Sequence, residues 1–184
     1  MVVGAPVVAV AWFVLLYGLL QPTHRGPTAT FWNRGRAAVL PQLDSIARRL
    51  RLGYAAYELD DSEYAGRIDA PIEDVDTLLA AYGFERMPLS AWKTLPDGRT
   101  EAGSWARREH PLAERQLHVM LFQAGEEATD CYAHEEFNAF HPRYAAAHYH
   151  AVEYNPPAGC RQLRELLGEA IIKPPASASE STGQ

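Results

Sequence analysis

An uncharged apolar run, Val2–Leu20, is the strongest hydropathy pattern in the chain. As a helix, a run of this length spans about 28 Å, close to the thickness of the hydrocarbon core of a bilayer. The pattern predicts a single transmembrane helix over residues 1–20. A cleaved signal peptide and a start codon placed too early are the alternatives. A signal peptide is disfavoured, because no basic residue precedes the run and no small-residue cleavage site follows it.

The residues after the run change character twice. Residues 21–40 contain two prolines and two glycines, which predicts a linker. Residues 41–52 show helical spacing of apolar side chains and are predicted to form a basic amphipathic helix. Its apolar face consists of Leu43, Ile46, Ala47 and Leu50. Since Arg48, Arg49 and Arg51 occupy the other faces, the helix is expected either to bind a membrane surface through them or to dock on the following domain.

Residues 54–172 switch between strand-like and helix-like periodicity and are predicted to form one domain. The expected strands cover residues 64–69, 84–87, 91–95, 99–107, 116–122 and 128–134, and the expected helices cover 71–82, 142–150 and 156–167. This order predicts an α+β fold, a two-layer domain with a mainly antiparallel sheet packed by helices. Residues 173–184 have the composition of a disordered tail.

Charge is distributed unevenly along the chain. The formal net charge of -6 makes nucleic acid an unexpected partner. Residues 25–51, however, hold six arginines and one acid, Asp44. By the positive-inside rule this basic block keeps the domain in the cytoplasm, on a single-pass anchor in the cell membrane. If the apolar run is a start-site artefact, the whole chain is expected in the cytoplasm. Cys131 and Cys160 are expected to be buried free thiols.

The candidate chemistry lies in a histidine-rich region. Six of the seven histidines fall between residues 110 and 150. A hairpin with a loop at 123–127 places His118 opposite Tyr132 and leaves His134 its diagonal neighbour, about 7–8 Å away. With Glu135 or Glu136, the two histidines form a donor set suited to a divalent transition metal. Packing residues on a sheet face are the alternative interpretation.

Three segments of this region resemble an uncharacterised prokaryotic α+β family over about residues 54–168. They are Arg115–Phe122, Tyr132–Glu136, and His141-Pro142 together with His148-Tyr149. Because no activity is assigned to that family, the resemblance implies a fold and transfers no catalytic residue. It also implies that the apolar N-terminal run is an addition specific to this chain.

The leading functional hypothesis is a membrane-tethered cytoplasmic module that binds a protein or a small molecule without catalysis and without a cofactor. Its candidate binding residues are His118, Tyr132, His134 and Glu135, and its expected partners include the lipid bilayer. The first alternative is a metal-dependent hydrolase in which His118, His134 and a nearby glutamate hold a divalent transition metal. The second alternative is a purely structural domain.

Overall fold

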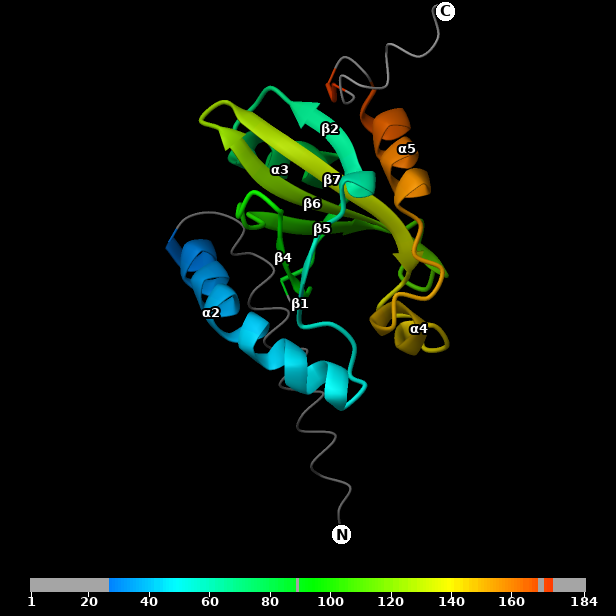
Figure 1. The fold of residues 1–184 in the computed structure, drawn as a ribbon. Helices are drawn as coiled ribbons and strands as arrows, with labels where there is room; N and C mark the ends of the chain where they lie inside the picture. Colours follow the sequence, from blue (N-terminus) through cyan, green and yellow to red (C-terminus); the bar gives the residue numbers. More distant parts are fainter. Residues whose placement is uncertain (1–26, 89, 169–170, 174–184) are drawn as a thin grey trace, which may run out of the picture.

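A computed structural model describes residues 27–88, 90–168 and 171–173 (Figure 1). Its centre is a five-stranded antiparallel sheet with the strand order β2-β7-β6-β5-β3. The five strands are β2 (Tyr64–Ile68), β3 (Glu85–Arg86), β5 (Gly103–Arg107), β6 (Arg115–Gly125) and β7 (Ala128–Phe137). A separate parallel pair consists of β1 (Ala56–Glu58) and β4 (Trp92–Thr94). The helices are α2 (Pro27–Arg49), η1 (Asp61–Glu63), α3 (Ile72–Ala81), α4 (Ala145–Tyr149) and α5 (Pro156–Leu167). The predicted α+β class with a mainly antiparallel sheet packed by helices is confirmed.

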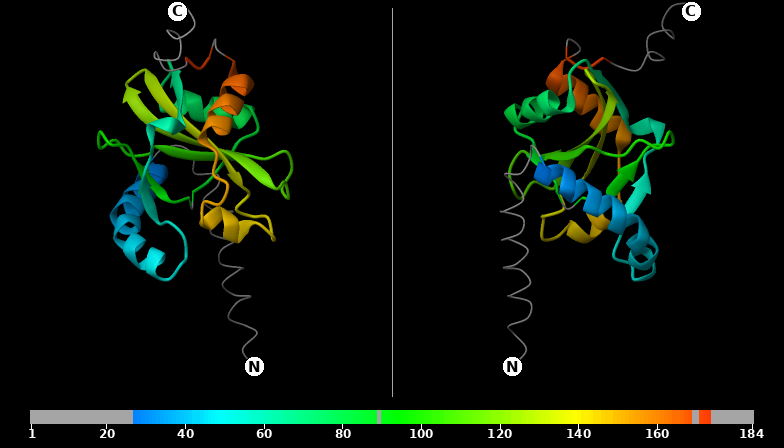
Figure 2. Two further views of the ribbon diagram at one scale, coloured as in Figure 1. Left: turned by 45° about the vertical axis from the view of Figure 1, so that its right-hand side comes forward. Right: turned by 90° about the vertical axis from the view of Figure 1, so that its left-hand side faces the viewer.

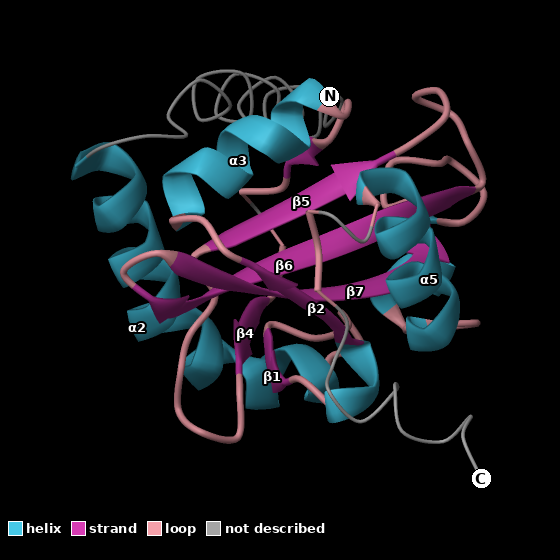
Figure 3. Cartoon of the chain, turned by 90° about the horizontal axis from the view of Figure 1, so that it is seen from above, coloured by secondary structure: helices cyan, strands magenta, loops and turns pink. Residues whose placement is uncertain are grey.

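One face of the sheet carries the main hydrophobic core. Figure 3 shows α3 and α5 crossing this face, with α2, β1 and β4 behind the sheet. The odd-numbered residues of the two long strands point into this core, because successive strand side chains alternate between faces. The buried side chains include Val75, Leu79, Trp105, Leu117, Val119, Leu121, Cys131, Ala133, Cys160 and Leu163. Cys131 and Cys160 are buried free thiols, as predicted.

The opposite face of the sheet is divided between a small apolar cluster and a polar region. Met120, Phe122 and Tyr132 pack with Leu59 and Leu95 at one end. At the other end the same strands present histidine and glutamate side chains. Both views in Figure 2 place α2 and α4 together at one end of the molecule, away from α3 and α5. The polar end of this face is therefore enclosed by α2, α4 and the β1–β4 pair.

The long hairpin forms with a different register from the one predicted. The ladder continues to the pair Gly125–Ala128, with an irregularity between Gln123 and Gly125, so the predicted five-residue loop is wrong. His118 consequently pairs directly with His134, not with Tyr132. The difference is two residues on the partner strand, which keeps each side chain on its predicted face.

The expected strands 91–95 and 99–107, which the turn at residues 96–98 was predicted to join as a hairpin, pair only near that turn. Leu95 N–H donates to Arg99 O at 2.9 Å, and Glu101 N–H donates to Lys93 O at 3.1 Å. Residues 92–94 then pair in parallel with β1 and do not join the main sheet. The residues of the turn at 96–98 were enough to predict that the chain reverses there. They gave no information on which distant strand Trp92–Thr94 pairs with.

A helix replaces much of the predicted linker over residues 21–40, because α2 begins at Pro27 and continues past Pro41 to Arg49. Proline is tolerated at the first helical position. The helix is held by tertiary contacts: Arg36 pairs with Glu101 at 2.7 Å, and Asp44 Oδ1 accepts hydrogen bonds from the N–H groups of Ala55 and Ala56. Such contacts outweigh weak local propensity.

Among the described residues, no helix combines the length and apolar character needed to cross a membrane. The predicted transmembrane helix over residues 1–20 lies outside the described residues. So does the predicted tail over 173–184, apart from Lys173, which pairs with Arg67 in an antiparallel bridge.

Candidate functional site

A cavity of about 660 Å³ lies against the polar end of the sheet, between α2, the β1–β4 pair and α4. Its wall is mostly apolar and aromatic, and includes Leu40, Leu52, Tyr54, Tyr57, Met87, Phe140, Tyr149 and Tyr154. Its polar lining includes Glu63, Lys93, Gln116, His118, Glu136 and His148. An apolar chamber with a few converging polar groups is the usual form of a small-molecule site.

His118 on β6 and His134 and Glu136 on β7 bring three ligand atoms together. His118 Nδ1 lies 3.1 Å from His134 Nε2 and 3.0 Å from Glu136 Oε1. His134 Nε2 lies 3.5 Å from Glu136 Oε2. A tetrahedral metal with bonds of 2.0–2.1 Å holds its ligand atoms about 3.3 Å apart. These contacts use both oxygens of Glu136, and one ligand atom from each of the three side chains lies within 4.8 Å of the other two, within reach of a shared ion. No other such group of three is found in the part of the chain that the structure describes.

Each member of this cluster is held by a further polar side chain. His134 Nδ1 donates to Glu63 Oε2 at 2.9 Å, which leaves Nε2 facing the cluster. His118 Nε2 lies 2.7 Å from Ser104 Oγ, so Nδ1 faces the cluster. Gln116 Nε2 donates to Glu136 Oε1 at 2.7 Å. Outer partners of this kind fix the tautomer and orientation of metal-binding imidazoles.

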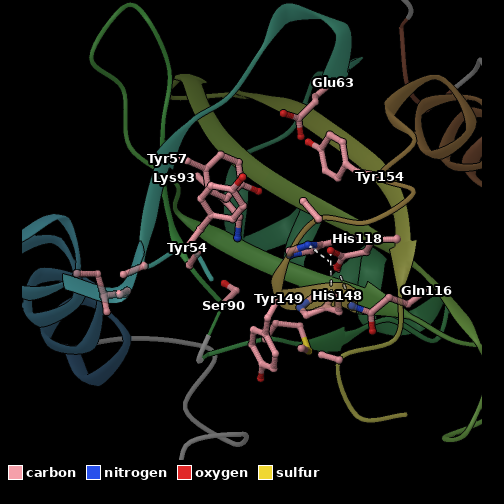
Figure 4. A pocket seen from close by; sticks show the side chains of 18 of the residues that line it. Tyr54, Tyr57, Glu63, Ser90, Lys93, Gln116, His118, His148, Tyr149 and Tyr154 are labelled. Carbon is pink, nitrogen blue, oxygen red and sulfur yellow. Dashed lines mark hydrogen bonds and ion pairs between the residues drawn. The ribbon is translucent and has the colours of Figure 1, made fainter. Parts of the chain in front are cut away.

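His148 approaches Glu136 from α4, with its Nδ1 3.1 Å from Oε2 (Figure 4). The same nitrogen lies 2.9 Å from the backbone oxygen of Phe137, which indicates that it carries a proton. Tyr154 stacks beside His134, with ring centroids 4.4 Å apart. These two side chains form the cavity wall next to the cluster.

The electrostatic environment shifts the pKa values of the two histidines in opposite directions. Burial, together with the positive charge of Lys93, lowers the pKa of His118 to about 3, so this ring is neutral at neutral pH. Burial also opposes protonation of His134, but its interactions with Glu136 and Glu63 outweigh burial and raise its pKa. Burial would raise the pKa of Glu136, but the two histidines hold it well below its usual range. Glu136 is thus a carboxylate, and one ring nitrogen of His118 is unprotonated.

Local structure explains how Glu63 reaches the cluster. Asp60 caps η1 by accepting a hydrogen bond from Ser62 N–H at 2.8 Å. The first oxygen of Glu63 accepts from Asp60 N–H to complete a capping box, and its second oxygen accepts from His134. One carboxylate therefore closes the turn and orients the imidazole.

Helix α5 fixes the backbone of His134 from the other side of the sheet. Gly159 packs so closely on β7 that an added Cβ would lie 2.3 Å from the Cα and carbonyl carbon of His134. Only glycine allows this approach without displacing one of the two elements. The position of His134 is thus determined by the helix as well as by the strand ladder.

The candidate residues taken from the sequence separate into two groups. The structure brings His118 and His134 together, and it selects Glu136 as the adjacent carboxylate. Glu135 lies on the opposite face, because strand side chains alternate, and it binds Arg115 at 3.0 Å. Tyr132 shares the face of the histidines but packs between Tyr64 and Phe122, outside the cavity lining. Of the two glutamates considered, Glu136 belongs to the cluster and Glu135 does not, and Tyr132 lies outside it.

The proposed membrane-surface arginines have specific environments. Arg48 pairs with Asp44 at 2.5 Å and lies over the ring of Tyr54, and all three arginines are exposed. Helix α2 docks on the domain through the face that carries Leu40 and Ala47, and these two residues line the cavity. Docking and an exposed basic surface are thus both present, on α2 and on the turn after it, because the helix ends at Arg49 and Arg51 lies in that turn.

Sequence reasoning missed the residues that surround the pair of histidines. Glu63, Ser104, Lys93 and Tyr154 come from four separate segments. No spacing along the chain connects them to the hairpin, although the Asp60–Glu63 capping box was a local signal. Comparison with models of known protein families, with curated proteins and with solved structures found no match to this chain. The resemblance to a prokaryotic α+β family stays a prediction.

Proposed function

We propose that this protein binds one divalent transition metal through His118, His134 and Glu136 and hydrolyses a small molecule in the adjoining cavity. The supporting observation is the convergence of ligand atoms from three buried side chains within 4.8 Å of one another, with an outer partner on each imidazole. Two histidines and one glutamate form a donor set known from hydrolytic zinc sites, where the metal activates water.

The number of ligands and the adjoining cavity favour a catalytic metal site over a structural one. A structural metal site has four protein ligands and is closed, whereas this cluster supplies three and borders a cavity. The purely structural alternative is disfavoured because burying the two carboxylates of Glu63 and Glu136 carries a desolvation penalty. Apolar side chains of similar volume would fill the same space without that penalty. A cavity that binds a small molecule without metal is the remaining alternative.

The direct test is metal analysis of the full-length chain after chelation and reloading with zinc, manganese or iron. We expect one metal per chain. His134→Gln should weaken metal binding by more than the ten- to hundredfold that loss of an outer partner costs. His110→Ala, which removes an exposed histidine outside the cluster, is the matched control. Absence of stoichiometric metal, together with no thermal shift on adding zinc or manganese, would refute the metal site and leave the cavity as a plain binding site.

The membrane tether is a separate part of the proposal. The uncharged run Val2–Leu20 and the arginines that follow it support a single-pass anchor with the domain in the cytoplasm. Deleting residues 1–26 should release the chain from the membrane fraction. If the shortened chain still sediments with membranes, the exposed apolar side chains of α2, Val39, Leu43 and Ile46, are the membrane contact instead.

A further inference from the structure

Lys93 is a buried cation that faces the cavity. It lies on β4, its side chain is 1% exposed, and it forms part of the cavity lining. Figure 4 shows it beside Tyr54 and Tyr57, with its amine directed toward the side where His118 lies. Burial lowers its pKa, and the neighbouring Glu101 opposes that effect. A buried lysine is costly unless its charge is matched, so its partners decide what it can do.

The protein matches this charge incompletely. The ammonium group has three protons to donate, and its hydrogen bond within the protein goes to Ser104 Oγ at 3.3 Å. Glu101 Oε2 also lies 3.3 Å away and forms a buried ion pair with the amine. The other oxygen of Glu101 is held by Arg36 at 2.7 Å. Glu101 is therefore shared by Arg36 and Lys93, and one of the three N–H groups of Lys93 is left without an acceptor among the described residues.

The balance of buried charges gives the same result. Among the described residues, Arg36 and Lys93 share the single carboxylate of Glu101, which leaves one positive charge in excess. The buried carboxylates Glu63 and Glu136 face the histidines instead. A divalent metal at the histidine end would balance these two, so the excess charge would remain at Lys93. One bound monoanion would neutralise it.

We propose that Lys93 binds the carboxylate of the substrate, and that the substrate is a small organic acid with an apolar or aromatic body. This inference rests on the proposed hydrolytic function, because it takes the molecule bound in the cavity to be the substrate. Ser104 Oγ contacts both the Lys93 amine and His118 Nε2, so the carboxylate and the cluster lie at the same end of the cavity. The apolar body fits the wall formed by Leu40, Leu52, Tyr54, Met87 and Tyr149.

The chain offers an unusually clean control, because Lys93 and Lys173 are its two lysines. Lys173 has a largely exposed side chain that is paired with Asp69. We would titrate 4-phenylbutyrate, its neutral amide and inorganic phosphate into the metal-loaded full-length chain by calorimetry. The variants are Lys93→Met, which leaves Glu101 balanced by Arg36, and Lys173→Met.

The wild-type chain should bind phenylbutyrate at least tenfold more tightly than the amide. The reason is that a hydrogen bond to a charged group contributes more free energy than a tenfold change in affinity requires. Lys93→Met should abolish the preference and keep its metal, whereas Lys173→Met should keep both. Equal binding of acid and amide to the wild-type chain would overturn the inference, even if Lys93→Met does not fold. Tighter binding of phosphate than of phenylbutyrate would also overturn it.

The outcomes separate this inference from the proposed function. Lys93-dependent binding of phenylbutyrate to a chain without stoichiometric metal would refute the metal site and support the carboxylate site. A stoichiometric metal without any preference for the acid would refute the carboxylate site alone.

Discussion

Replacing Gly159 by alanine tests how α5 positions strand β7, which carries His134 and Glu136. The added Cβ would lie 2.3 Å from two backbone atoms of His134 and 2.6 Å from the nitrogen of Glu135. Strand β7 cannot yield easily, because it is hydrogen-bonded to β2 on one side and to β6 on the other. Restoring ordinary contact therefore requires a displacement of about 1 Å between helix and strand, given normal carbon–carbon separations near 3.5 Å.

The expected loss of stability follows from this displacement. Overpacking a well-packed core costs about 1–3 kcal/mol or more, and alanine returns at most about 1 kcal/mol of helix propensity. We expect Gly159→Ala to lower the melting temperature of the full-length chain by about 2–8 °C in thermal unfolding followed by circular dichroism. Metal affinity should fall as well, because His134 moves with its backbone.

Gly35→Ala is the matched control. Gly35 also lies in a helix, α2, but a Cβ there meets nothing within 4 Å. This variant should be as stable as the wild type, or more stable by up to about 1 kcal/mol. The packing argument is wrong if Gly159→Ala melts at the wild-type temperature, or if both variants lose stability equally.

Three further predictions concern buried carboxylates. Glu63→Gln removes the negative charge behind His134 and should weaken metal binding by about ten- to hundredfold in a chelator competition, and unchanged affinity would argue against an orienting role. Glu101→Ala leaves two buried cations without their carboxylate and should cost about 3–5 kcal/mol in urea unfolding, where a loss below about 1 kcal/mol would contradict the charge balance. Burial opposes ionisation of Asp130, but hydrogen bonds from two arginines lower its pKa overall. Its stabilising contribution should thus be complete above about pH 4 and lost as the pH falls through the lowered value. In pH-dependent unfolding, the wild type should lose its advantage over Asp130→Asn on acidification, and a constant difference would exclude this linkage.

Part of the site was predictable because it lies on one hairpin. Residues 116–122 and 128–134 alternate apolar and polar side chains, and this alternation is enough to assign His118 and His134 to one face. The register was not predictable to the residue, since the turn at residues 126–127 is shorter than the expected loop. The error of two positions preserved the face but misplaced the partner: Tyr132 was expected opposite His118, where His134 lies.

The sequence limited the carboxylate beside the two histidines to Glu135 or Glu136 but could not decide between them. His134, Glu135 and Glu136 are adjacent in the chain, and only the pleat of β7 decides that Glu136 shares the histidine face. Glu135 instead contacts Arg115 and Gln162 on the other side. A one-residue change of register would have exchanged the two glutamates.

Local periodicity was sufficient to predict most secondary elements of the domain, its α+β class and the face that carries the two histidines. The cavity and the enclosure of the cluster depended on tertiary structure. Glu63, Ser104 and Lys93 reach the site from η1, β5 and β4, through contacts that span many residues of chain. Helix α2 covers the cavity where a linker was expected, because the buried pair of Arg36 with Glu101 and the bonds of Asp44 hold it there. Periodicity records which side of an element is buried, and it carries no information on which distant element buries it.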